Sequence, residues 1–167
     1  MKRTGVILTL TSSLLLAACA SGGGVNPGSR LRVEASAITA GPYGELWEIR
    51  VREYSDGSGA ELTFSSSEGS QELNGSAILG REWLQAFTET VATQKFYELP
   101  AEISGEFVEF HLPDLYLTVC RARSCHKVNL YDPNRVGATP EGMRFFAVWQ
   151  AVVEQLPLKS AIKWQGT

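Results

Sequence analysis

Two closely spaced cysteines, Cys120 and Cys125, have the clearest potential for chemistry in this 167-residue chain. Alternating apolar and polar residues on both sides of them predict two antiparallel strands joined by a four-residue loop, Arg121–Ser124. If Cys120 faces Cys125, the apolar residues of the two strands also face one another, which supports this register. Opposed residues in such a pair are close enough for a disulfide. We therefore predict a structural disulfide, which stabilises the fold by roughly 2 kcal/mol for a six-residue ring.

The same cysteines could support redox or metal chemistry. Redox cycling favours a cysteine pair at a helix N-terminus or beside a group that lowers a thiol pKa, whereas this pair lies in a predicted hairpin. Zinc could be held by the cysteines together with His111 or His126. However, Cys125 and His126 are consecutive in a strand, so their side chains point to opposite faces. We therefore expect no metal and no cofactor.

An acidic segment before the hairpin could support proton transfer. Glu109 and His111 would lie on one face of a predicted strand and could exchange a proton, and Glu106 and Asp114 are close in sequence. The alternative is a solvent-exposed acidic strand ahead of a turn at Pro113. Because the common hydrolase, metalloprotease and nucleotide-binding motifs are absent from the sequence, we expect a protein that is not an enzyme, with a hydrolase as the alternative.

Positive charge is concentrated at the tip of the predicted hairpin, in a domain that is otherwise acidic. Arg121 and Arg123 lie in the loop, and Lys127 follows beside His126. A solvated loop tip explains this pattern without any partner. Alternatively, Arg121, Arg123 and Lys127 form a contact for another protein with an acidic surface or for a polyanion, because a local opposite charge steers association.

The N-terminus predicts export. A basic start precedes residues 5–18, an uncharged segment that is typical of a signal peptide and too short to cross a bilayer as a helix. The segment ends in Leu16-Ala17-Ala18-Cys19, which resembles the lipobox of bacterial lipoproteins. The resemblance implies a signal peptide over residues 1–18, and fatty acylation of Cys19, with chains such as palmitate, on its thiol and its new amino group.

The lipobox resemblance also implies a location. Several acyl chains make attachment to a membrane stable, which places the protein in the bacterial cell envelope. Ala20 stands where lipoproteins of the inner membrane often carry Asp, so the resemblance implies the outer membrane, facing the periplasm. Residues 20–30 are rich in glycine and lack hydrophobic periodicity, and we interpret residues 19–30 as the lipidated cysteine and a flexible tether.

Length and charge limit the remaining classes. The length fits a single globular domain over residues 31–167. A net charge of −3 argues against a nucleic acid as the main partner, because binding to phosphates requires a basic surface. Removal of residues 1–18 changes the net charge to −5, so we expect the lipid to be the only contact with the membrane.

Hydrophobic periodicity predicts strands and two helices within this domain. A period of two predicts a first hairpin and a second hairpin around the cysteines, and Gly75 weakens a further strand between them. A spacing of three and four predicts helices, the second of which begins at Thr139 as N-cap and ends before Pro157. The predicted strands cover residues 47–52, 61–65, 71–77, 115–120 and 125–130, and the predicted helices residues 81–96 and 140–156.

The order of these elements predicts an α+β fold, in which an antiparallel sheet of four to five strands in two hairpins carries two helices packed on one face. Two segments, residues 96–100 at the end of the first helix and residues 125–128 in the second hairpin, resemble parts of small bacterial lipoprotein domains of unknown function. We therefore expect a membrane-anchored envelope lipoprotein that acts as a noncatalytic binding or structural module. The alternatives are a periplasmic enzyme inhibitor, which would present rigid hairpin tips to its target, and a periplasmic hydrolase.

Overall fold

A computed structural model describes residues 30–38, 45–68, 71–105 and 113–156. The predicted signal peptide, Cys19 and nearly all of the tether lie outside the described residues. The same holds for Glu106, Glu109 and His111 of the acidic segment.

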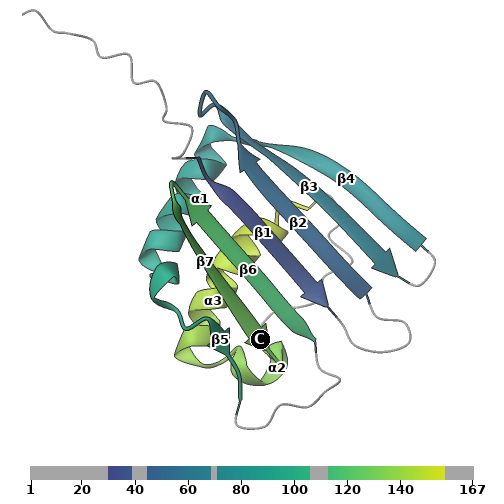
Figure 1. Cartoon of the computed structure of the whole chain (residues 1–167), viewed down its shortest axis with the longest axis vertical. Coiled ribbons are helices and arrows are strands. Elements are labelled where there is room, and N and C mark those ends of the chain that lie inside the picture. Colours follow the sequence, from purple (N-terminus) through teal and green to yellow (C-terminus); the bar gives the residue numbers. More distant parts are fainter. Residues whose placement is uncertain (1–29, 39–44, 69–70, 106–112, 157–167) are drawn as a thin grey trace, which may run out of the picture.

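Seven strands form one sheet in the order β4-β3-β2-β1-β6-β7-β5 (Figure 1). Every neighbouring pair is antiparallel except β5 and β7, which are parallel. Strand β1 lies between the two hairpins and pairs with β2 on one side and β6 on the other. The strands are β1 (Arg32–Ile38), β2 (Glu45–Glu53), β3 (Gly59–Glu68), β4 (Gln71–Gly80), β5 (Glu102–Ile103), β6 (Asp114–Arg121) and β7 (Ser124–Tyr131).

The two longer helices, α1 and α3, lie on the same side of the sheet, behind it in Figure 1. The side chain of Thr139 accepts a hydrogen bond of 3.0 Å from the backbone N–H of Gly142, which confirms the predicted N-cap of α3. No helix in the described part of the chain is long and apolar enough to span a bilayer. The helical segments are α1 (Arg81–Thr93), the short 3-10 helix η1 (Phe96–Glu98), α2 (Pro133–Val136) and α3 (Pro140–Val153).

The hydrophobic core fills the space between the sheet and these helices. Alternate residues of each central strand face it, such as Val33 in β1 and Leu117 in β6. Helix α1 contributes Phe87, and α3 contributes Phe145 and Trp149, whose stacked rings are 6.0 Å apart between centroids. Because each such side chain stabilises the fold by about 1.5–3 kcal/mol when buried, one face of the sheet is strongly fixed against the helices.

The predicted α+β class is confirmed, but the number of elements differs. The sheet has seven strands rather than four or five, and the helices include the short α2. Strand β1 was not predicted because two of its three core-facing residues, Ala35 and Ala37, are alanines, which have a low preference for strands. The two-residue strand β5 is too short to give a pattern. The first predicted helix was too long, because Lys95 adopts a left-handed conformation (φ 48°, ψ 46°) after α1 ends.

Strand β4 is complete despite Gly75, although a glycine predicts a weak strand at this position. Gly75 pairs with Phe64 of β3, and a Cβ atom at position 75 would overlap the Phe64 ring. The buried Phe64 therefore takes the space that a side chain would fill. Here a glycine allows the close approach of an aromatic ring instead of marking the end of a strand.

We expect Gly75→Ala to lower the free energy of unfolding by about 1–3 kcal/mol, because the new methyl group would displace the Phe64 ring. Urea unfolding followed by circular dichroism measures this change. Ser76→Ala is the matched control, because Ser76 is exposed and its replacement should change the stability by less than about 0.5 kcal/mol. Equal stability of the two variants would contradict the proposed packing.

Candidate functional site

In the described part of the chain, no helix covers the face of the sheet opposite α1 and α3, and we call it the open face (Figure 1). The strand registers align side chains on this face into rows that cross the sheet. One row runs through Thr63, Arg50, Glu34, Thr118 and Lys127, from β3 to β7. It therefore alternates basic, acidic and hydroxyl groups across five strands.

The next row along the strands is mostly uncharged. It runs through Ser65, Glu48, Ser36, Tyr116 and Asn129. Asn129 is buried, and its Oδ1 atom makes no hydrogen bond within the described residues. The two rows together present hydroxyl, amide and charged groups around a single tyrosine.

These rows border a hollow of about 400 Å³ on the open face. A smaller hollow of about 160 Å³ shares Glu48 and Arg50 with it and continues over β3. The hollowed surface thus extends from β3 to β7. The larger hollow is lined by Glu34, Ala35, Ser36, Ile38, Glu48, Ile49, Arg50, Tyr116, Thr118 and Lys127.

The charges around the larger hollow largely compensate one another. Arg50 Nη2 lies 3.0 Å from Glu48 Oε2. Lys127 Nζ lies 4.9 Å from the centre of the Tyr116 ring, within the range of a cation–π interaction. With two acidic and two basic residues in its lining, the hollow is polar but carries no net charge.

Tyr116 is held as a hydrogen-bond donor at the edge of this hollow. Its hydroxyl donates to Asp114 Oδ2 over 3.4 Å. Burial raises the pKa of Tyr116 above its usual value, and the negative charge of Asp114 raises it further. Burial also raises the pKa of Asp114, against the lowering effect of the hydrogen bond from Tyr116. The phenol therefore stays protonated at neutral pH and does not act as a base.

The predicted disulfide between Cys120 and Cys125 is present, in the predicted register. The strands continue further than expected, so the loop has two residues, Ala122 and Arg123, instead of four. Ala122 has a positive φ of 56°, as the first central residue of a tight hairpin turn of type II′ requires. The disulfide thus closes the hairpin next to its turn.

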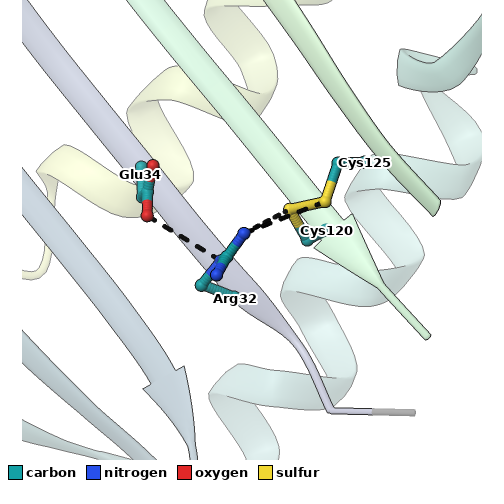
Figure 2. Close-up of a disulfide and its surroundings, with 4 residues drawn as sticks. All are labelled: Arg32, Glu34, Cys120 and Cys125. Atoms are coloured by element: carbon teal, nitrogen blue, oxygen red, sulfur yellow. Dashed lines mark hydrogen bonds and ion pairs between the residues drawn. A yellow bond between two sulfur atoms is a disulfide. The ribbon is translucent and has the colours of Figure 1, made fainter. Parts of the chain in front are cut away.

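An arginine of β1 contacts this disulfide. Figure 2 shows the Arg32 side chain directed toward the two sulfur atoms, with Glu34 on its other side. Arg32 Nη2 lies 3.4 Å from Cys120 Sγ and 4.0 Å from Cys125 Sγ, and Arg32 Nε lies 3.8 Å from Glu34 Oε1. The contact joins the end of the second hairpin to β1, across the strand pair that connects the two halves of the sheet.

The three residues predicted as a partner contact lie in two places. Arg121 is exposed beside the hairpin turn, and Arg123 is exposed within it. Lys127 lies two rows from this turn on the open face, over the Tyr116 ring. The predicted register already places Lys127 opposite Thr118, on the face away from the core, and the structure confirms this pairing.

His126 lies on the helix side of the sheet. One of its ring nitrogens is 2.9 Å from the carbonyl oxygen of Leu99, and its ring packs edge-on against Phe96. It therefore faces away from Lys127 and the open face. Within the described ranges, no group of three histidine, cysteine or acidic residues could hold a metal ion.

Comparison with protein-family models gives no match, and a search of curated proteins gives no significant match. The geometry of the chain itself therefore carries the functional argument.

We expect the double variant Cys120→Ala/Cys125→Ala to lower the free energy of unfolding by about 2 kcal/mol, because the cross-link no longer restricts the unfolded chain. Guanidinium unfolding measures this change. Reduction of the native protein serves as the control and should have the same effect. A protein whose stability does not change on reduction would rule out a structural role for the bond.

We expect Asp114→Asn to stabilise the fold at neutral pH. The pKa of Asp114 is raised in the folded state, so ionisation of this group opposes folding, and its contribution to stability is lost as the pH rises through the folded pKa. The advantage of the variant should disappear below the ordinary pKa of 3.8, where Asp114 is protonated in both states. Unfolding curves at several pH values measure this, and an advantage that grows on acidification would contradict it.

Proposed function

We propose that this protein is a noncatalytic binding module, anchored by lipid in the bacterial cell envelope, that binds another envelope component on its open sheet face. The observation that carries the proposal is the hollowed, polar surface that crosses β3, β2, β1, β6 and β7. Such a surface offers hydrogen-bonding groups from five strands whose positions are fixed by the core on the other face. Rigid presentation of this kind lowers the entropic cost of binding.

The location in the envelope is supported by two features. Leu16-Ala17-Ala18-Cys19 resembles a lipobox, and Cys120 and Cys125 form a disulfide. Disulfides persist in oxidising compartments such as the periplasm and are rare in the cytosol. With Cys19 as the acylated residue, each of the three cysteines in the chain has a role.

A binding role is supported by how the charged groups of the open face are used. Arg50 pairs with Glu48, and Lys127 packs over Tyr116. The hydroxyl of Tyr116 is engaged with Asp114. These contacts hold the side chains in place without directing a base and a nucleophile at one point, as a hydrolase needs. They are suited to recognition of a polar partner.

A periplasmic enzyme inhibitor is the second candidate, and the β6–β7 tip is the feature that favours it. The disulfide lies one residue from each end of the two-residue turn, and Arg123 is exposed within the turn. Such a short, cross-linked tip could enter an active site with little loss of conformational freedom. In this case the partner would contact Arg123 rather than the open face.

Mass spectrometry of the protein isolated from its native membrane tests the anchor. We expect the mature chain to begin at Cys19 and to carry fatty acyl groups, and Cys19→Ala to abolish acylation and to release the protein from the membrane fraction. A mature native chain with an unmodified Cys19 in the soluble fraction would exclude the anchor.

Photo-crosslinking in the intact envelope separates the two candidate binding surfaces. We expect a photoreactive amino acid at Thr63, which is exposed on the open face, to capture the partner. The same group at Glu89, exposed on α1, is the matched control. Capture from position 123 instead would favour the inhibitor, and capture of one species from all three positions alike would contradict a defined binding face.

A further inference from the structure

Six arginines lie at one end of the sheet, and five of them are close together, apart from Arg81 after the edge strand β4. Arg32 and Arg52 are directly opposite each other in β1 and β2, and Arg32 is also opposite Cys120, the neighbour of Arg121 in β6. Arg123 lies in the adjoining turn, and Arg30 precedes Arg32 by two residues. Because neighbouring strands are about 4.8 Å apart, the five residues belong to a narrow region. We call this region the arginine end.

Most charges of the arginine end are not neutralised. Within the described part of the chain, Arg32 is the only one of the five with an ion pair, a long one of 3.8 Å to Glu34. Elsewhere, Arg50 pairs with Glu48, and Lys95 with Glu98. Arginines placed directly opposite each other repel, and the fold nevertheless brings Arg32 and Arg52 together.

The five arginines only slightly outnumber the acidic residues near this end, which are Glu34, Glu53, Asp56 and Glu61 and are partly engaged. Glu61 lies opposite Arg52. Glu53 accepts a hydrogen bond of 2.7 Å from the backbone N–H of Leu31, and Asp56 accepts one of 2.9 Å from Ser58. The opposite end of the central strands has a different composition, because its last row consists of Leu46, Ile38, Asp114 and Tyr131 and holds no cation. Positive charge is thus concentrated at one end of the strands.

The arginine end is also the end at which the chain arrives from Cys19. Arg30 belongs to it, and ten residues separate Cys19 from Arg30 in the sequence. Even fully extended, this segment spans no more than about 40 Å. A lipid on Cys19 would therefore hold the arginine end within about 40 Å of the bilayer, within reach of its surface.

We propose that the arginine end contacts the anionic phospholipid headgroups of the leaflet that holds the anchor, so that the strands stand away from the membrane and the open face remains free for its partner. The inference rests on the proposed lipid anchor. Anionic headgroups attract clustered Lys and Arg residues close to the surface. The net charge of the whole chain gave the opposite expectation, because it does not report where the charges lie.

Vesicle binding of the mature chain with Cys19→Ser tests this contact without the lipid. At low ionic strength, we expect co-sedimentation with vesicles of equimolar phosphatidylcholine and phosphatidylglycerol, and not with vesicles of phosphatidylcholine alone. Arg121→Gln/Arg123→Gln should weaken the binding about tenfold, and Arg121→Lys/Arg123→Lys should retain it, because the attraction depends on charge. High salt should abolish it.

Comparison of Arg123→Gln with Arg135→Gln supplies the matched control, because each variant removes one positive charge. Arg123 lies in the turn at the arginine end, whereas Arg135 lies in α2, after the far end of β7. Arg123→Gln should weaken the binding, and Arg135→Gln should bind as the native sequence does. Equal weakening by these two variants, or equal binding to both kinds of vesicle, would overturn the proposal.

The vesicle assay and the anchor test can fail separately. An unmodified Cys19 in the native protein would remove the anchor without changing the result with vesicles. Conversely, an acylated native protein whose Cys19→Ser form ignores phosphatidylglycerol would keep the anchor and refute the contact. If Arg121 and Arg123 are crosslinked to an acidic protein while the vesicles are ignored, the arginine end serves that protein instead.

Discussion

The pairing of β1 with both of its neighbours is the interaction on which the rest of the structure depends. Strand β1 pairs with β2 of the first hairpin and with β6 of the second, and so joins them into one sheet. Without β1, each hairpin would have a free edge. Each of the polar rows on the open face passes through β1, at Glu34 or Ser36, and the arginine end does so at Arg32. The contact of Arg32 with the disulfide adds a second link between β1 and the second hairpin.

Local patterns were sufficient where the partners are close in sequence. The β6–β7 register and the disulfide follow from alternation over about fifteen residues, and the start of α3 follows from Thr139 and Pro140. The position of β1 could not be predicted in this way, because its pattern is weak and it pairs with a strand distant in sequence. Arg32 of β1 and its partner Cys120 of β6 are 88 residues apart. The hollow on the open face was missed for the same reason: each strand shows polar residues at alternate positions, but only the strand order places Arg50, Glu34 and Lys127 in one row.

The fold also decides how the charges act. The chain is acidic as a whole, yet its basic residues are used differently in different regions. On the open face, Arg50 and Lys127 are engaged by Glu48 and Tyr116 and shape a hollow without net charge. At the arginine end, residues from three strands and a turn add up to a local positive region. Net charge describes neither situation, because both arise from pairing between distant segments.

The order of the strands along the chain has a consequence for folding. A chain that emerges from its N-terminus delivers β1 first, and β6 only after some eighty further residues have followed. During that interval β2 can pair with β1 on one side, but the other side has unpaired N–H and C=O groups and can associate with foreign strands. The second hairpin can form without such a delay, because its two strands, which carry Cys120 and Cys125, are adjacent in sequence. The first strand to emerge is therefore among the last to be enclosed, and protection of its unpaired side is a requirement of folding rather than of the finished structure.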